Sequence, residues 1–387
     1  MRRGFVISKM KLTRNLRRNV MRGHPWIYKE ALQVLKSDPK SPLAEVLDQK
    51  GKFLAWALYD EAGPLSLRIL SLEKKPPNEN FFKDLIQKSH ARRSFLEPER
   101  TNAYRLINGE GDRLPGLVCD LYDKTAVLQF DGEGPKKFWS RYPVADWVQE
   151  LTGAEGVVDK TRGVYASIQG AAPTSETVIL ENGLRFVIDI VQGQKTGFFL
   201  DQRDSRQYVR ALSKDKSVMN LFSYTGGFSI YAGAGGAKEV LSVDLAKPAL
   251  EMAEKSWNLN EFKNGSHSTA ASDVFDYLKS DARLWDVVIV DPPSMAHAEA
   301  QRVAAMTKYT AIFKEAASKV QRGGNLILSS CSSHVSFEDF FQIITESLSQ
   351  AGRRGLIQRV SGQGADHPFP HVCPELRYLK FVHLALE

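Results

Sequence analysis

The stretch from Val218 to Asp244, VMNLFSYTGGFSIYAGAGGAKEVLSVD, constrains the fold of this 387-residue chain more than any other. It reads as an apolar strand, a turn containing Gly226 and Gly227, an apolar helix from Phe228, and a second apolar strand. That strand ends on Asp244, 18 positions after Gly226. A glycine turn followed about 20 residues later by an acid at a strand end is how α/β folds hold a nucleoside. The stretch therefore predicts a parallel α/β sheet with a ribose-binding acid at Asp244.

The turn lacks the marks of a pyrophosphate site. It does not read G-x-G-x-x-G, and no lysine follows it in the manner of a phosphate-binding loop. A nucleoside ligand without a pyrophosphate fits better, and we expect S-adenosylmethionine. The alternative is a flavodoxin-like sheet in which the glycines serve only close packing.

A second signal is the sequence LWDVVIVDPPSMAH. Residues 287–290 form an apolar run typical of a strand buried in a parallel sheet. Asp291, Pro292 and Pro293 then stop it, because two successive prolines continue neither a strand nor a helix. The result is a rigid corner at the carboxyl edge of the sheet, which can hold a flat group such as a nucleobase against a methyl donor.

A third signal is Cys331, which follows the apolar strand starting at Leu326. This position places a thiol at the same sheet edge as Asp244 and Asp291. Ser336 is expected to begin the next helix, and a helix N-terminus would favour the thiolate. The alternative is a buried cysteine that only packs. His334 is near enough in sequence to assist, without a defined role.

Other polar residues are expected near this edge. In QKTGFFLDQR, a glycine turn leads into a helix, and Phe199 and Gln202 are expected to contact ligand beside Lys195. Capping of that helix by Asp201 is nearly as well supported. Asp273 follows a short strand and is expected to bind the adenine amino group; the alternative is that it only caps a helix.

Residues 1–177, somewhat less than half of the chain, divide into two smaller units. Residues 1–73 alternate like paired strands and predict a small β-rich domain, with a polar, proline-marked linker after it. Residues 74–177 predict a small α+β domain with a helix over 81–96 that buries Phe95 among other apolar residues. Its later elements read strand-strand-helix-strand, with the last strand at VYASIQG. Residues 178–387, which contain all three signals, predict a single α/β domain.

The N-terminal unit carries a basic and aromatic cluster that includes Arg17, Arg18, Trp26 and Lys29. One interpretation is an RNA-binding surface on which cations contact phosphates and rings stack on bases. The other is a solvated helix face with Trp26 in the core, and the sequence supports the two about equally.

Composition limits the other classes of function. A net charge of +7 permits a polyanionic partner without requiring one. Three widely spaced cysteines show neither a disulfide framework nor zinc-ligand spacing, so we expect no metal and a reducing, cytoplasmic location. The longest apolar runs are too short for a transmembrane helix, so no membrane partner is expected.

Together these motifs resemble the S-adenosylmethionine-dependent large-subunit (23S) rRNA (cytosine-5) methyltransferases that carry an N-terminal PUA domain. The resemblance covers essentially the whole chain, and its motifs are GHPWIY (23–28), NGEGDRLPGLVCDLY (108–122), QKTGFFLDQR (194–203), NLFSYTGGFS (220–229), DPPS (291–294) and SCS (330–332). It implies a PUA-like domain, an EEHEE-type middle domain and a Rossmann-like methyltransferase domain. It also implies large-subunit rRNA as the partner, and leaves open whether the chain forms a homodimer.

The resemblance also implies roles for individual residues. S-adenosylmethionine, with S-adenosylhomocysteine as its product, would bind residues of the central turn and the strand ends: Phe199, Gln202, Phe222, Tyr224, Thr225, Gly226, Gly227, Asp244, Asp273 and Asp291. Cys331 would be the nucleophile, with Asp291 at the base as second catalytic group. The substrate set is Arg17, Arg18, Trp26, Lys29, Lys195, Pro292 and Pro293.

The sequence departs from related enzymes at one position. Many RNA cytosine-5 methyltransferases of other subgroups have a second cysteine after the proline corner, where this chain has Ser294. The group that removes the carbon-5 proton is therefore unidentified. A guanine N-methyltransferase, which needs no thiol, and a non-catalytic RNA-binding protein are the remaining alternatives.

Overall fold

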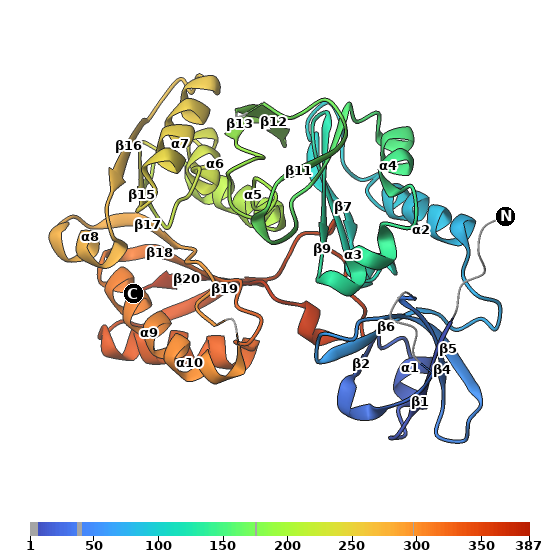
Figure 1. The fold of residues 1–387 in the computed structure, drawn as a ribbon. Helices are drawn as coiled ribbons and strands as arrows, with labels where there is room; N and C mark the ends of the chain where they lie inside the picture. Colours follow the sequence, from blue (N-terminus) through green and yellow to red (C-terminus); the bar gives the residue numbers. More distant parts are fainter. Residues whose placement is uncertain (1–6, 37–40, 175, 297) are drawn as a thin grey trace.

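The computed structural model describes residues 7–36, 41–174, 176–296 and 298–387 (Figure 1). Three sheets follow one another along the chain, with a two-stranded hairpin between the second and the third. The predicted fold class, a β-rich unit and an α+β unit before a Rossmann-like α/β unit, is confirmed. Among the described helices, none is both long and apolar enough to cross a membrane.

The first unit is a six-stranded sheet in the order β2-β6-β5-β4-β1-β3. Its elements are β1 (Ser8–Leu12), α1 (Arg17–Met21), β2 (Trp26–Tyr28), η1 (Lys29–Ala31), β3 (Leu32–Lys36), β4 (Leu43–Leu47), β5 (Phe53–Tyr59) and β6 (Leu65–Ser71). Side chains such as Met10, Val46 and Leu67 form a small core of their own. Residues 1–6 and 37–40, which the prediction included in this unit, lie outside the described residues.

The second unit is a five-stranded sheet in the order β11-β10-β9-β8-β7 with helices packed on it. Its elements are α2 (Glu79–Ala91), β7 (Ala103–Asn108), η2 (Gly109–Asp112), β8 (Leu117–Tyr122), β9 (Thr125–Phe130), α3 (Glu133–Trp139), α4 (Val144–Thr152), β10 (Gly156–Asp159), η3 (Thr161–Gly163) and β11 (Ala166–Gly170). An aromatic cluster around Phe82, Phe138 and Trp139 fills its core.

Three details of this unit correct the prediction. The sequence reading missed α3, whose first turn contains Gly134 and Pro135, and β10, which is only four residues long. VYASIQG therefore supplies the fifth strand rather than the fourth, paired antiparallel with β10. Phe95 lies beyond the end of α2 and is 51% exposed, so it is not part of the buried helix face.

A hairpin connects the second unit to the third. Its strands are β12 (Thr177–Glu181) and β13 (Leu184–Ile188). The backbone N–H of Val187 donates to Ser256 Oγ at 2.9 Å, which fixes the hairpin against the helix that follows the second strand of the third sheet.

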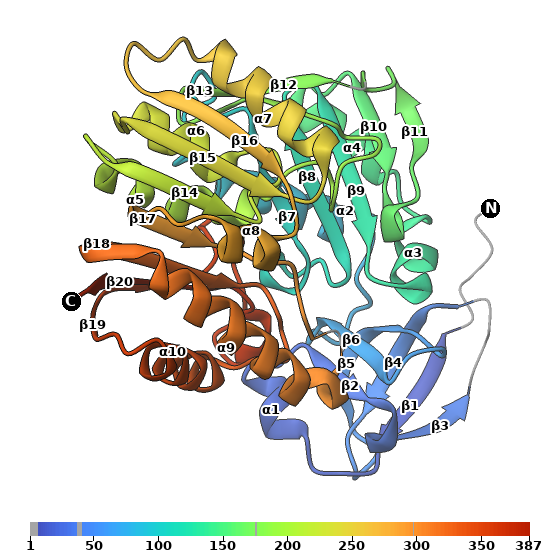
Figure 2. The ribbon, with the colours of Figure 1, turned by 90° about the vertical axis from the view of Figure 1, so that its left-hand side faces the viewer.

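The third unit is a seven-stranded sheet in the order β16-β15-β14-β17-β18-β20-β19, which can be followed in Figure 2. Its elements are η4 (Leu200–Gln202), α5 (Arg203–Leu212), β14 (Ser217–Leu221), α6 (Gly227–Ala234), β15 (Glu239–Asp244), α7 (Lys247–Leu259), β16 (Ser266–Ala271), α8 (Val274–Ser280), β17 (Trp285–Val290), η5 (Glu299–Gln301), α9 (Arg302–Ser318), β18 (Val320–Ser330), α10 (Phe337–Gln350), β19 (Gly355–Ser361), η6 (Pro374–Leu376) and β20 (Lys380–Leu386). The strands pair in parallel except β20, which is antiparallel to both of its neighbours.

Successive side chains of the central strands point to opposite faces of this sheet, and both faces are buried under helices. In β17, Val288 and Val290 join the core formed with α8, α9 and α10, while Val287 and Ile289 join the core formed with α5 and α6. The chain proceeds from β14 to β15 and β16 on one side, then returns to β17 on the other side of β14. Ligands of open α/β sheets bind at such a reversal, outside the carboxyl ends of the strands.

A buried carboxylate, Asp366, joins the C-terminal segment to the start of α5 and to the middle unit. Its Oδ2 accepts from Arg203 Nη2 at 2.7 Å and from the backbone N–H of Arg105 at 3.0 Å, and its carbonyl accepts from Arg93 Nη2 at 2.7 Å. The segment between β19 and β20 thereby lies against the middle unit (Figure 1). Burial alone would raise the pKa of Asp366, but His367 and Arg203 hold that pKa well below its ordinary value.

We predict that Asp366→Asn lowers the free energy of unfolding by about 3–5 kcal/mol, because it removes the nearest counter-charge of the buried Arg203. The pKa of Asp366 is depressed in the folded protein, so the loss should be complete at neutral pH and should begin to shrink below about pH 4. Urea unfolding at several pH values measures this. The control is Asp84→Asn, a substitution at an exposed residue. An equal loss of unfolding free energy in the two variants would contradict the prediction.

Candidate active site

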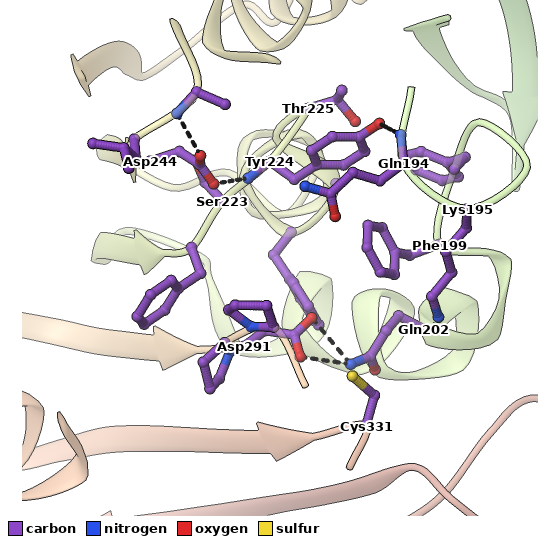
Figure 3. Close-up of a pocket in the computed structure, with 18 of the residues that line it drawn as sticks. Gln194, Lys195, Phe199, Gln202, Ser223, Tyr224, Thr225, Asp244, Asp291 and Cys331 are labelled. Carbon is purple, nitrogen blue, oxygen red and sulfur yellow. Dashed lines mark hydrogen bonds between the residues drawn. The ribbon is translucent and has the colours of Figure 1, made fainter. Parts of the chain in front are cut away.

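A cavity of about 460 Å³ lies at the carboxyl edge of the seven-stranded sheet (Figure 3). The ends of β14, β15, β17 and β18 all contribute to its wall. The predicted residues that line it are Lys195, Phe199, Gln202, Phe222, Tyr224, Thr225, Gly227, Asp244, Asp273, Asp291, Pro292, Pro293 and Cys331. Parallel strands thus bring together side chains that are up to 136 positions apart in the sequence, from Lys195 to Cys331.

The turn after β14 has an unusual backbone. Phe222 and Tyr224 have φ of 57° and 49°, in the left-handed region that side chains other than glycine seldom adopt. Hydrogen bonds hold this conformation: the Tyr224 N–H donates to Asp244 Oδ2 at 2.8 Å, and the Tyr224 hydroxyl accepts from the Gln194 N–H at 2.8 Å. Such local strain is concentrated at ligand sites.

Gly226 has a different role from the predicted one. It does not line the cavity, and a Cβ at this position would come within 2.7 Å of Ala253 Cβ on α7. Its φ of 75° and this close helix contact explain the glycine, so the packing alternative describes Gly226 correctly. Gly227, the next residue, does line the cavity.

Two acids at neighbouring strand ends are held by backbone groups. Asp244 accepts from the backbone of Tyr224 and, through Oδ1, from the Ala246 N–H at 2.8 Å. Asp273 is the N-cap of α8, where its Oδ1 accepts from Phe275 N and Asp276 N. Since both residues also line the cavity, helix capping and ligand contact are compatible for Asp273.

The Asp291 carboxyl lies at the other end of the cavity from Asp244 (Figure 3). Gln202 Nε2 donates to it, at 3.1 Å from both Oδ1 and Oδ2. Burial raises the pKa of Asp291 to about 6, although a hydrogen bond from Ser329 opposes the shift. An acid with a pKa near 6 can exchange a proton near neutral pH, as acid–base catalysis requires.

Cys331 directly follows β18, and its sulfur points towards Gln202 and Asp291 (Figure 3). Burial raises the pKa of this thiol; Asp291 adds to the shift, while Lys195 and Lys380 oppose it. The net shift in the pKa of Cys331 in the free protein is therefore opposite to the shift expected from the next helix. Ser336 does cap α10, as predicted, but the electrostatic balance at Cys331 is set by burial and the nearby charges.

Lys380 holds the loop that carries Cys331, and sequence reasoning missed it. Its buried ammonium donates to the carbonyls of Ser332, Val335 and Tyr378 at 2.6–2.8 Å. Burial lowers the pKa of Lys380 to about 8. No local pattern marks this residue, because it reaches the site from the last strand of the chain.

The partly exposed Lys195 and the buried Asp201 form an ion pair in the wall of the cavity. Lys195 Nζ lies 3.1 Å from Asp201 Oδ2, which also accepts from the Tyr378 hydroxyl at 2.7 Å. The ammonium also lies 4.6 Å from the centre of the Phe199 ring. Asp201 makes no cap hydrogen bond to α5, so the helix-capping alternative for this residue is wrong.

Comparison with known proteins identifies the family. The pattern of the S-adenosylmethionine-dependent methyltransferases matches residues 165–377, and that of PUA-like domains matches residues 10–72. Ribosomal RNA large subunit methyltransferase of Deinococcus radiodurans is 34% identical over 400 residues, covering 98% of this chain and 97% of the relative. Ribosomal RNA large subunit methyltransferase I of Vibrio vulnificus is 35% identical, covering 95% and 97%. The chain belongs to the ribosomal RNA large subunit methyltransferase I family.

Solved structures support the fold of this methyltransferase. One is a structure from Streptococcus mutans that is described as a SAM-dependent methyltransferase. The match covers 97% of this chain and 99% of that structure, with a TM-score of 0.86 and 23% identity. A second methyltransferase structure, solved with S-adenosylhomocysteine, has a TM-score of 0.87. S-adenosylmethionine is thus the methyl donor of this methyltransferase, as its sequence predicted.

The cavity of the methyltransferase fits this donor. Ser223 Oγ and Thr225 Oγ1 line it, are buried, and have no hydrogen-bond partner among the described residues. Buried hydroxyls without partners are uncommon in proteins and indicate a polar ligand. Asp244 and Asp273 add acceptors for the hydroxyl and amino groups of a nucleoside. Sequence reasoning missed Ser223, although it lies within the motif.

Residues predicted to bind RNA outside the cavity lie in the first unit of the methyltransferase. Arg18 and Lys29 are exposed, and Arg17, also exposed, pairs with Asp48 at 3.2 Å. Trp26 is half-buried, and its indole N–H donates to Glu110 in the middle unit at 2.9 Å. This contact joins the first unit to the middle unit, and the predicted contact of Trp26 with RNA stays a prediction.

Two further groups lie away from the cavity. His334, considered as an assistant to Cys331, does not line it; its Nδ1 is 3.6 Å from Glu299 Oε2. His24, Cys373 and Glu375 bring metal-ligand atoms within 4.8 Å of one another. Burial and Glu375 raise the pKa of Cys373 to about 12, which keeps that thiol protonated.

We predict opposite effects of two substitutions on alkylation of Cys331 at pH 8. Asp291→Asn removes a negative charge that raises the pKa of the thiol, so alkylation should accelerate; Lys195→Met removes a positive charge, so alkylation should slow, each by about ten-fold. Peptide mass spectrometry after iodoacetamide treatment measures the rates, and the buried Cys119 reports unfolding. Equal rates in both variants and the wild type would contradict this account.

Proposed function

We propose that this methyltransferase modifies carbon 5 of a cytosine in large-subunit (23S) rRNA, through a covalent adduct with Cys331. The observation that carries the proposal is that the Cys331 thiol shares one cavity with the Asp291 carboxyl and the donor turn. The names of the most similar relatives support rRNA as the substrate class. A ribosomal substrate implies a cytoplasmic site of action.

A thiol is needed because carbon 5 of cytosine is a weak nucleophile. The Cys331 thiolate adds to carbon 6, and the electron pair of the 5,6 double bond becomes available at carbon 5. S-adenosylmethionine, when bound, supplies an electrophilic methyl group and leaves as S-adenosylhomocysteine. Loss of the carbon-5 proton then restores the double bond and expels the thiolate.

Asp291 is suited to assist the addition. Attack at carbon 6 places negative charge on the ring, which a proton at nitrogen 3 neutralises. The pKa of Asp291, raised to about 6 by burial, lets this carboxyl supply that proton and recover it later. Lys195 and Lys380 stabilise the thiolate once it forms, since both lower the pKa of Cys331.

Three parts of the chain have different roles in this reaction. Residues 178–387 hold the donor and perform the chemistry, with donor contacts from Phe199, Tyr224, Thr225, Gly227, Asp244 and Asp273. Residues 1–73, with the exposed Arg17, Arg18 and Lys29, contact RNA phosphates, and residues 74–177 connect the two.

The test uses S-adenosylmethionine with a deuterated methyl group and large-subunit rRNA, offered naked and in assembled subunits. We expect nuclease digestion and mass spectrometry to find the label in 5-methylcytidine, and Cys331→Ala to lose the product by at least about 10⁴-fold. The folding control is the affinity of the variant for S-adenosylhomocysteine. It should stay within two-fold of the wild-type affinity, which is a difference of at most about 0.4 kcal/mol in binding free energy.

Two outcomes would contradict the proposal. Label in a methylated guanine would assign the enzyme to nitrogen methylation, which needs no thiol. Undiminished 5-methylcytidine formation by Cys331→Ala would remove Cys331 from the reaction.

A further inference from the structure

Gln202 is placed beside the two groups that act on the base. It is only 2% exposed, ends η4, and lines the cavity. Figure 3 shows its amide next to Asp291 and Cys331, at the opposite end of the cavity from Asp244. This position separates Gln202 from the nucleoside end of the donor site and brings it to the end where the proposed function places cytosine.

The hydrogen bonds of the Gln202 amide fix its orientation. Nε2 lies 2.8 Å from Ser329 Oγ and 3.1 Å from each Asp291 oxygen. Ser329 donates its single hydroxyl hydrogen to Asp291, so its oxygen must accept from Gln202. Only the NH₂ end of the amide can satisfy this arrangement, and the carbonyl end points elsewhere.

The carbonyl oxygen of Gln202 is left without a partner. Oε1 is buried, and no hydrogen bond reaches it from the described residues. An unpaired buried acceptor is unfavourable. A ligand that donates an N–H to it forms a hydrogen bond without breaking an existing one in the protein. The cavity therefore offers a fixed acceptor at its Cys331 end.

Asp291 alone does not distinguish cytosine from uracil. With its pKa near 6, the carboxyl can be protonated and donate to nitrogen 3 of cytosine, or ionised and accept from the N–H at that position in uracil. The two bases differ further at carbon 4, which carries an amino donor in cytosine and an oxygen acceptor in uracil. A protein group that contacts the substituent on carbon 4 therefore determines whether cytosine or uracil is bound.

We propose that Gln202 is that group: its Oε1 accepts from the amino group on carbon 4 of cytosine and opposes the oxygen of uracil. The inference rests on the proposed function and adds the residue that makes the pocket specific for cytosine. A site whose buried polar groups match one base rejects the other strongly, because the wrong base leaves them unpaired.

Tritium release tests this assignment. Methylation at carbon 5 expels the hydrogen there, so large-subunit rRNA labelled with [5-³H]cytidine or with [5-³H]uridine reports each base separately. The RNA is offered naked and in assembled subunits. The readout is the ratio of release from cytidine to release from uridine, which a purely structural defect would leave unchanged.

Three variants are compared with the wild type. Gln202→Met keeps the length of the side chain without the acceptor, and we expect the ratio to fall at least about ten-fold. Gln202→Glu keeps an acceptor, so the ratio should persist even though a second carboxylate beside Asp291 changes the absolute rate. Gln194→Met, the same change at an exposed residue of the same cavity, should also keep the ratio.

The outcomes separate this inference from the proposed function. An unchanged ratio in Gln202→Met overturns the inference alone. A large loss of S-adenosylhomocysteine affinity with an unchanged ratio also overturns it and assigns Gln202 to the donor. Methyl transfer by the wild type without tritium release from cytidine overturns the proposed function, and the inference with it.

Discussion

The buried run Asp201–Gln202–Arg203 is the constraint on which the active site depends. Each of its three polar side chains has a different partner: Asp201 binds Lys195 and Tyr378, Gln202 binds Asp291 and Ser329, and Arg203 binds Asp366. Removing a partner leaves a buried charge or amide with weaker compensation, which is unfavourable. The run therefore forces β17, β18 and the C-terminal segment into one arrangement, and that arrangement is the catalytic end of the cavity.

The same burial sets the chemistry. It raises the pKa of Asp291 to about 6, so this carboxyl can gain or lose a proton near neutral pH, and it raises the pKa of Cys331, so the thiol keeps its proton in the free protein. Lys195, which is partly exposed, and the buried Lys380 both supply positive charge close to the thiol. A cytosine whose nitrogen 3 accepts a hydrogen bond from Asp291 favours the protonated carboxyl, and this removes the negative charge that opposes the thiolate. In this account, substrate binding itself activates Cys331, which protects the free protein from indiscriminate thiol reactions.

Local patterns in the sequence predict much of the fold and most of the cavity. Apolar runs mark β14, β15, β17 and β18, and parallel strands necessarily bring Asp244, Asp291 and Cys331 to one edge. What local patterns cannot show is contact between distant segments. Tyr378 and Lys380 reach the site from just before and at the start of β20. Gly226 is required by Ala253 on the next helix, and the pKa of Cys331 is a balance of burial and several charges. The four-residue β10 was too short for its pattern to be read.

The most direct test of the central claim is covalent trapping on rRNA that contains 5-fluorocytidine, in the presence of S-adenosylmethionine. Fluorine cannot leave carbon 5 as a proton does, so the adduct should persist on a denaturing gel, with peptide mapping locating the bond at Cys331. Cys331→Ala should form none. Absence of an adduct, alongside normal methylation of unmodified RNA, would show that the thiol only packs and that the methyl group goes to another atom.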